Sequence, residues 1–244
     1  VGSEMCIRDS ININIKKKHL PSLLKIAVLQ PIAYFTCETF GIQMTTASES
    51  GSIIACIPIA SLVASILFLQ KKPTRFQTSG ICLTVVGVIV CVTAKGFESS
   101  FSGIGYIMLC MAVLSYSLYC VSAEKADKTT SIEKTYVMIA CGACFFATMA
   151  IARSIAADTV VDLFMLPFQN TVFLFSILYL GIASSVLSFV LFNISISSIG
   201  TNKASSFVGI STAVSVLAGV FILDEKFSAM QCYGTLIILL GVYI

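Results

Sequence analysis

The sequence predicts an all-α integral membrane protein made of two inverted five-helix repeats, with about eight of the ten helices present. Three observations lead to this fold class. The chain of 244 residues is 57% hydrophobic and only 11% charged, whereas about a quarter of the residues of a soluble protein are charged. Its mean hydropathy is +0.96, and two of its segments repeat each other. Lipid is therefore the expected solvent for most of the chain.

The apolar runs are long enough to cross a bilayer. A helix that rises 1.5 Å per residue needs about 20 residues to span a hydrocarbon core of about 30 Å. The eight candidate transmembrane helices lie at residues 20–46, 52–69, 76–94, 103–123, 135–152, 171–199, 204–223 and 229–244. Residues 1–10 are polar and unpatterned. They resemble translated sequencing-adaptor or cloning sequence, so we exclude them from the fold.

Residues 48–90 recur at residues 202–244 with a constant offset of 154 (225 − 71 = 154) and no gap. Each copy is an apolar run, a short polar break and a second apolar run. A polar residue and two glycines match at the same spacing, which indicates a duplicated unit. Such duplication is typical of repeat-built membrane transporters. The matched pairs include Ser61/Ser215, Ala64/Ala218, Lys72/Lys226, Gln77/Gln231, Gly80/Gly234 and Gly87/Gly241.

The repeat also divides the chain into two parts. Residues 99–244 hold five expected helices, while residues 11–98 hold three that match only the last three of those five. Subtracting the offset places the partners of the other two helices before residue 1. We therefore expect two further helices upstream, ten helices in the parent protein, and an N-terminally truncated sequence here.

Charge differs between the two sets of expected loops. By the positive-inside rule, the lysine-rich loops and the C-terminus are cytoplasmic. Since five is odd, Lys71 and its repeat partner Glu225 fall on opposite sides of the membrane, and inverted halves place a substrate site near the midplane. The cytoplasmic set holds Lys16, Lys17, Lys18, Lys25, Lys71, Lys72, Arg75, Lys125, Lys128, Lys134 and Lys203, against Lys95, Arg153 and Lys226 in the other.

Short motifs then identify a family resemblance. Thr45-Thr46-Ala47-Ser48 leads into a helix with Pro58 in its first half, Asp224-Glu225 closes the matching helix, and the two glycine pairs follow. Over about residues 20–244 the sequence resembles the EamA-like, ten-helix branch of the drug/metabolite transporter superfamily. The resemblance implies export or exchange of small metabolites across the inner or plasma membrane. Two positions depart from the family pattern: Lys71 replaces a usual acidic residue, and Thr212 replaces a usual proline.

Glu38 is the one acidic residue well inside an expected span. A carboxylate at the centre of a membrane helix costs about 2.5–3.5 kcal/mol on insertion scales, so it should face a cavity or be protonated. Gln30, Tyr34 and Thr45 recur at helical spacing and share its face. A carboxylate held away from water suits proton exchange or recognition of a cationic or amine substrate. The alternative is a protonated Glu38 that bonds a neighbouring helix for packing.

Other polar side chains extend this candidate binding site. The repeat partners of two residues on that face are Ser184 and Ser188, which offer hydroxyls from the second half. Tyr116 and Tyr119 lie on overlapping faces of one helix, where they suit either a cavity wall or the helix core. Asn193 lies off the Ser184 face, and we expect it to form an interhelical hydrogen bond instead of binding a ligand.

Pro31 and Pro58 are candidate hinges, because proline can interrupt a membrane helix and free backbone carbonyls; a harmless kink is the alternative. Cysteine and histidine suggest no cofactor and no metal site. Cys141 and Cys144 have a redox or zinc-half spacing, but they lie within an apolar helix without a second pair. His19 stands beside three lysines at the membrane surface.

Three functional classes stay open. The first is a secondary active transporter that works by alternating access, with proton-coupled export or exchange of a small metabolite, amine or drug-like solute. A metabolite/metabolite exchanger of the nucleotide-sugar or amino-acid type, without proton coupling, is the alternative within this class. A membrane-embedded enzyme would need a polar cluster that the spans lack, and a scaffold would need a soluble appendage, whereas the longest polar loops are expected at 124–134 and 153–170. Inverted duplication favours transport. Nucleic acid is not an expected partner; a homodimer is compatible with the sequence.

Overall fold

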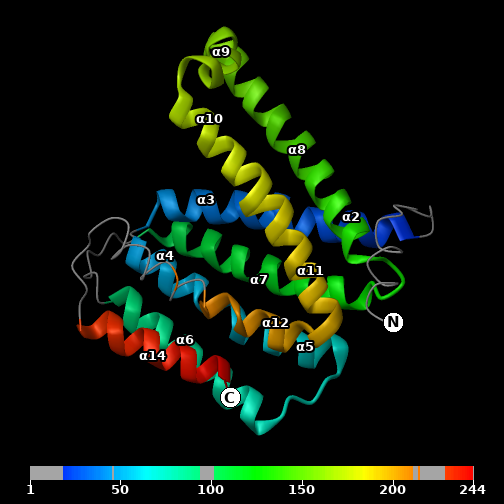
Figure 1. The fold of residues 1–244 in the computed structure, drawn as a ribbon, viewed down its shortest axis with the longest axis vertical. Helices are drawn as coiled ribbons and strands as arrows, with labels where there is room; N and C mark the ends of the chain where they lie inside the picture. Colours follow the sequence, from blue (N-terminus) through cyan, green and yellow to red (C-terminus); the bar gives the residue numbers. More distant parts are fainter. Residues whose placement is uncertain (1–18, 46, 94–101, 211–213, 215–228, 244) are drawn as a thin grey trace.

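The computed structural model describes residues 19–45, 47–93, 102–210, 214 and 229–243. Within these ranges the chain forms helices joined by short connections and contains no strand. The predicted all-α membrane fold is confirmed. In Figure 1 the helices form a bundle from which one long hairpin projects, made of α8 (Ser131–Ala156) and α10 (Thr171–Leu178), with α9 (Val160–Gln169) at its tip.

Within the described residues, four helices are long and apolar enough to cross a membrane. The first, Leu20–Gln43, consists of α2 (Leu20–Ala27), the π-helical segment η2 (Val28–Tyr34) and α3 (Phe35–Gln43). The second and third are α7 (Gly103–Lys125) and α8 (Ser131–Ala156). The fourth, Thr171–Ile199, consists of α10 (Thr171–Leu178), the π-helical segment η3 (Tyr179–Leu187) and α11 (Ser188–Ile199). All four coincide with predicted spans.

Shorter helices occupy the remaining predicted spans. The run at 52–69 is divided into α4 (Ala47–Ile54) and α5 (Ile57–Leu69), with Pro58 in the first turn of α5. α6 (Arg75–Thr93) and α14 (Ala229–Tyr243) cover the runs at 76–94 and 229–244. α12 (Thr201–Ser206) begins the run at 204–223, most of which lies outside the described residues.

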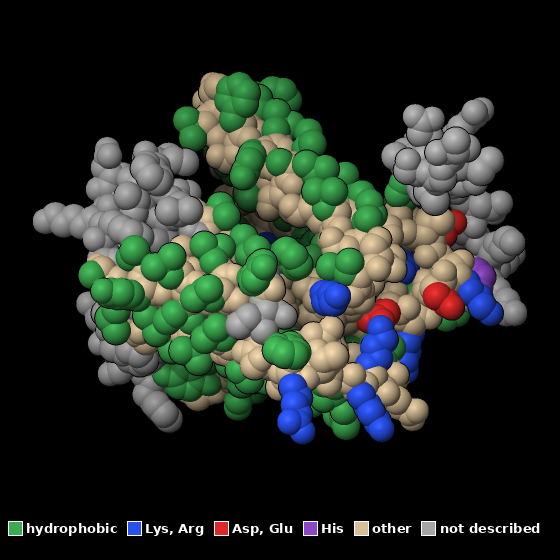
Figure 2. Space-filling view, turned by 60° about the horizontal axis from the view of Figure 1, so that its bottom comes forward, with side chains coloured by type: hydrophobic (Ala, Val, Ile, Leu, Met, Phe, Trp, Pro, Cys, Tyr) green, Lys and Arg blue, Asp and Glu red, His purple; other side chains and the backbone are tan. Residues whose placement is uncertain are grey.

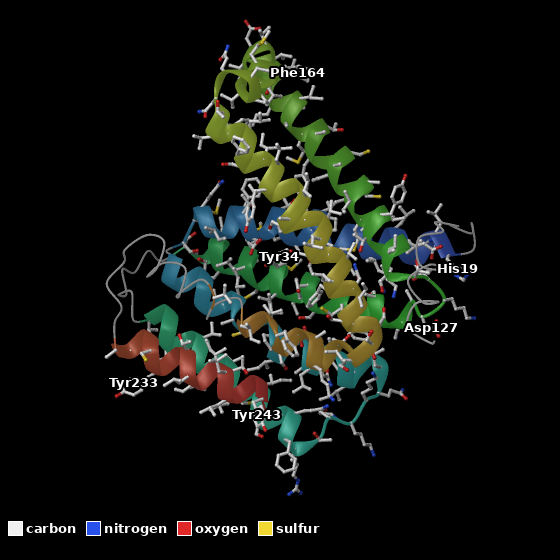
Figure 3. All side chains as sticks on the ribbon, viewed as in Figure 1. His19, Tyr34, Asp127, Phe164, Tyr233 and Tyr243 are labelled. Carbon is white, nitrogen blue, oxygen red and sulfur yellow. The ribbon has the colours of Figure 1, made fainter. Side chains whose placement is uncertain are left out.

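The expected polar loop at 153–170 is wrong, because it contains the helix α9 (Val160–Gln169). Val161, Phe164, Met165 and Phe168 recur along α9 at spacings of three and four, and all four are exposed. Figure 3 labels Phe164 at the tip of the projecting hairpin. A short helix with an exposed apolar face at the end of two spans is suited to lie in the membrane interface.

α7 lies at the centre of the bundle. It packs against η2, α3, α4 and α5 from the N-terminal part of the chain and against α11 from the C-terminal part. Its residues Leu109, Ala112, Tyr119, Cys120 and Ala123 are fully buried. Much of the hydrophobic core therefore lies along α7, which packs against helices from both parts of the chain.

Lys71, Lys72, Lys134 and Lys203 lie at one end of the bundle, which we call the lysine-rich end. Polar contacts join several helix ends there. Lys71, after α5, forms an ion pair with Glu124 of α7. The second carboxylate oxygen of Glu124 accepts a hydrogen bond from the backbone N–H of Thr201 at 2.8 Å, at the start of α12. Lys134 is buried and donates to the carbonyl of Ala123 at 2.7 Å. Lys71, which departs from the family pattern, is thus paired with a carboxylate on a neighbouring helix.

α6 and α14 pack with their backbones in close approach (Figure 1). A Cβ atom on Gly87 would lie 2.8 Å from the carbonyl oxygen of Gly234, and one on Gly241 would lie 2.7 Å from that of Gly80. Small residues at such positions let membrane helices approach closely enough for dispersion contacts between backbones. Each contact joins one glycine of the first copy to the repeat partner of the other. Gly87 contacts Gly234, the partner of Gly80, and Gly80 contacts Gly241, the partner of Gly87.

We predict that Gly87→Ala destabilises the protein by about 1–3 kcal/mol, because the new methyl group meets backbone atoms that cannot move aside alone. Thermal unfolding in detergent micelles measures the effect. Gly181→Ala is the matched control, since a Cβ atom there has open space within 4 Å. The control should unfold at the wild-type temperature or slightly above it. Equal unfolding temperatures for the two variants would contradict the close approach of α6 and α14.

Candidate functional site

The centre of the candidate site is a hydrogen bond between two residues of the first span. The hydroxyl of Tyr34 donates to Oε1 of Glu38 at 2.7 Å. Tyr34 is 8% exposed, and Glu38 is half-buried. Glu38 lies five residues before the end of the helix at Gln43, or about 8 Å from that end at 1.5 Å per residue. The carboxylate is therefore nearer the end of the span than the sequence suggested.

The other members of the predicted face are placed differently. Gln30 is 3% exposed, and its Oε1 has no hydrogen-bond partner among the described residues. The hydroxyl of Thr45, two residues beyond the end of α3, donates to the carbonyl of Gly41 at 2.8 Å. Gly41 and Thr45 pack closely against α7, because Cβ atoms on Gly41 and Gly105 would collide with Leu109 and Thr45 respectively. On the predicted face, Gly41 and Thr45 thus pack against α7, and Tyr34 and Glu38 form a hydrogen-bonded polar pair.

A π-helical segment precedes the Tyr34–Glu38 pair. η2 contains Pro31, which has no N–H to donate and therefore breaks the regular α-helical pattern. Pro31 packs on Gly142 of α8, where a Cβ atom would lie 3.0 Å from the proline ring. The repeat equivalents of residues 28–34 are residues 182–188, and η3 covers most of them. Single π-helical turns in α-helices are often found at functional sites, and here they occur at matched places in both parts of the chain.

Six aromatic rings, one of them that of Tyr34, contact one another and join three helices; we call them the aromatic cluster. Tyr116 of α7 is central, with its ring centroid 5.2 Å from that of Tyr34 and 5.8 Å from that of Phe192 on α11. Figure 3 labels Tyr34 in the middle of the molecule. The rings are contributed by both parts of the chain, so a change in how these parts pack would alter the surroundings of Glu38. The cluster consists of Tyr34, Phe35, Tyr116, Tyr119, Phe189 and Phe192.

Tyr119 connects the cluster to a buried polar network. Its hydroxyl donates to Oδ1 of Asn193 at 3.0 Å, and Nδ2 of Asn193 donates to the hydroxyl of Thr135 at 3.0 Å. Tyr119 and Asn193 have no exposed surface. The interhelical hydrogen bond predicted for Asn193 is confirmed. It satisfies the hydroxyl of Tyr119 within the protein, which matches the helix-core alternative for that residue.

Ser184 and Ser188 are not brought to Glu38. Both are exposed, and the Ser188 hydroxyl donates to the carbonyl of Ala183 at 3.1 Å. In the described part of the chain, neither hydroxyl has a hydrogen bond to Glu38 or Tyr34. The second part of the chain instead contributes Phe189 and Phe192, which the sequence did not single out. Phe192 is the repeat partner of Glu38, and that equivalence was the signal available for it.

Phe35 and Phe189 are repeat partners that touch each other. Their numbers differ by the same 154 residues as the duplicated segments (189 − 35 = 154), and their ring centroids lie 6.3 Å apart. In a two-fold arrangement, a residue that contacts its own equivalent lies next to the symmetry axis. Tyr34 directly precedes Phe35 in the sequence, so the Tyr34–Glu38 pair lies next to this contact.

No group of three His, Cys, Asp or Glu side chains within the described ranges is arranged to hold a metal ion. Polar groups in or bonded to the aromatic cluster include Glu38, the tyrosine hydroxyls and the amide of Asn193. This set can exchange a proton and can face a cationic group with aromatic rings.

The chain is similar to known membrane transporters in sequence. The profile of the EamA-like transporter family matches residues 6–93 and 103–244. A Bacillus subtilis (strain 168) protein named "Uncharacterized transporter YcxC" is 33% identical over 234 residues, which cover 95% of this chain and 75% of that protein. An "Uncharacterized transporter" of Archaeoglobus fulgidus is 23% identical over 235 residues, 94% of this chain and 79% of that one. A crystal structure with 13% sequence identity superposes with a TM-score of 0.72 and covers 91% of this chain and 75% of the other. That last likeness concerns the fold alone.

We predict that Asn193→Ala lowers the free energy of unfolding by about 0.6–2 kcal/mol, because it leaves the hydroxyls of Tyr119 and Thr135 without their shared partner. Titration of the protein from mild detergent into sodium dodecyl sulfate measures this. Ser195→Ala on the same helix is the control, since in the described part of the chain its hydroxyl bonds the carbonyl of Leu191 in its own helix. If both variants unfold at the same detergent fraction, the network does not hold α7, α8 and α11 together.

Proposed function

This chain belongs to the EamA-like transporter family and is a multi-pass membrane protein, and from that premise we propose a secondary active transporter that exchanges protons for a small metabolite, amine or drug-like solute at Glu38. One observation carries the proposal: Glu38 accepts a hydrogen bond from Tyr34 inside a membrane span, within an aromatic cluster built by both matched segments. Ionisable residues inside the membrane are costly, and they commonly mark substrate or proton pathways.

The proposed mechanism depends on two halves of inverted orientation. Three contacts support an inverted duplication: the Phe35–Phe189 contact and the two crossed glycine contacts between α6 and α14. The two segments matched by the family profile also divide near the proposed boundary between residues 98 and 99. In such a fold, one half rocks against the other around a site at their interface, which opens to one side of the membrane at a time.

Glu38 links this motion to protons by competition. When ionised, its carboxylate accepts the hydrogen bond from Tyr34 and attracts a cationic substrate, whose charge the rings of Tyr34 and Tyr116 also favour. A proton on Glu38 removes the negative charge and releases that substrate. Because proton and substrate use the same carboxylate, each crosses only when the other has left. Tyr34 acts as a positioning residue that fixes the direction of the carboxylate.

We further propose that the lysine-rich end faces the cytoplasm. Figure 2 shows basic side chains gathered along the lower part of one face. In Figure 3, His19 and Asp127 lie at one side of the molecule, away from Phe164 and Tyr233. The positive-inside rule then orients the chain in the plasma or inner membrane. A homodimer stays a prediction from the sequence.

Proton flux tests the function. The protein is reconstituted in liposomes that contain a pH-sensitive dye, and pools of amines, amino acids, nucleosides and sugars are added under an imposed proton gradient. We predict that one pool moves protons and that Glu38→Gln reduces this flux at least tenfold, while Tyr34→Phe gives an intermediate rate. Asp127→Asn removes an exposed carboxylate outside the spans and should keep the wild-type rate.

Two results would contradict proton coupling at Glu38. The first is a wild-type flux in Glu38→Gln. The second is a solute that crosses without any movement of protons; exchange of two labelled metabolites across the same liposomes would then support the metabolite/metabolite exchanger.

A further inference from the structure

A small polar cavity lies at the lysine-rich end, outside the candidate transport site. Its volume is about 190 Å³, and it lies between the connection from α5 to α6 and the turn from α11 to α12. Its polar lining consists of Lys71, Lys72, Gln77, Thr201, Asn202 and Lys203. Nothing in the proposed proton and substrate exchange uses this cavity, so its chemistry needs an explanation of its own.

The cavity carries unpaired positive charge. Lys71 is neutralised by Glu124, whose other oxygen is occupied by the N–H of Thr201. Lys72 and Lys203 are exposed, and no carboxylate among the described residues lies within ion-pair distance of either. Two ammonium groups therefore line one cavity without a paired carboxylate among the described residues. Flexible lysine side chains can converge on a phosphate group, to which each donates charge-assisted hydrogen bonds.

The cavity also contains a buried hydrogen-bond acceptor that has no partner in the described part of the chain and that a ligand could satisfy. Oδ1 of Asn202 is buried and has no hydrogen-bond partner among the described residues. A buried acceptor without a partner is costly, so a bound molecule that supplies a hydroxyl or other donor here would be favoured. A ligand that carries both a phosphate and hydroxyl groups satisfies the lysines and Asn202 together.

The surroundings of the cavity fit a lipid better than a soluble ion. α6 begins at Arg75, and Phe76, the neighbour of the cavity residue Gln77, is 73% exposed. Phe207, one residue beyond α12, is 52% exposed. Aromatic rings beside basic residues at the ends of membrane helices are suited to the boundary between headgroups and acyl chains. Basic pockets between such helix ends bind anionic headgroups in other membrane proteins.

We propose that this cavity binds the phosphate group of an anionic phospholipid with a hydroxylated headgroup, such as phosphatidylglycerol. Lys72 and Lys203 hold the phosphate, and the amide oxygen of Asn202 accepts a hydrogen bond from a headgroup hydroxyl. The lipid bridges the α5–α6 connection and the start of α12, next to the Lys71–Glu124 ion pair. Its expected effect is to stabilise the packing of these two connections.

Thermal unfolding in mixed micelles tests the proposal. Phosphatidylglycerol should raise the unfolding temperature saturably, while phosphatidylcholine, which is zwitterionic, should not. The double variant Lys72→Gln/Lys203→Gln should weaken the apparent affinity for phosphatidylglycerol by about tenfold or more. Lys72→Arg/Lys203→Arg should retain the response, which separates loss of charge from a fold that simply fails.

The matched control is Lys25→Gln/Lys128→Gln, which removes two exposed lysines from the lysine-rich end but leaves the cavity intact. It should keep the wild-type response. An equal response in the cavity variant and this control would overturn the proposal, since the effect would then be general surface charge. Glycerol 3-phosphate and inorganic phosphate are added in parallel at matched concentrations. If they stabilise the protein and phosphatidylglycerol does not, the lipid assignment is overturned.

Discussion

The interior of a bilayer offers no water, so a polar group in a membrane span is costly unless it has a partner within the protein. This constraint accounts for the side-chain hydrogen bonds within and between the spans. Short hydroxyl side chains bond the backbone of their own helix, as Thr84 does with Gly80 and Ser117 with Val113. Longer polar side chains reach further. Asn193 connects α11 to α7 and α8, and Tyr34 and Glu38 satisfy each other one helical turn apart.

Apolar attraction cannot hold helices together in lipid as it does in water, so close packing and aromatic contacts take its place. The backbones of α6 and α14 approach at glycines, and the rings of Tyr116, Phe192 and Tyr34 fill the space between α7, α11 and the first span. Packing of this kind is discrete. Two arrangements of the same halves can differ by which rings and glycines meet, and such bistable contacts are what alternating access requires. A carboxylate at their boundary is well placed to sense the difference.

Much of this fold could be predicted from the sequence, because twenty-residue apolar runs and a gapless repeat are strong signals. The Tyr34–Glu38 pair was predicted from helical spacing alone, and the structure joins them with a hydrogen bond. Contacts between helices were harder, because spans surrounded by lipid are apolar on all sides and lack a periodicity that would mark the packed face. For that reason Phe189, Phe192 and the Glu124 partner of Lys71 were missed. α9 was missed because Asp162, Pro167 and Gln169 interrupt its apolar pattern, and Ser184 and Ser188 were expected nearer to Glu38 than they lie.

The central claim is that two halves of opposite orientation meet around the Tyr34–Glu38 pair, and labelling of repeat partners tests it most directly. The ten native cysteines are replaced, and single cysteines are introduced in place of Lys72 and of its repeat partner Lys226, which lies outside the described residues. A membrane-impermeant maleimide is then applied to cells. We expect position 226 to react in intact cells and position 72 only after permeabilisation. Reaction of both positions from the same side would contradict inverted halves, and with them the rocking mechanism.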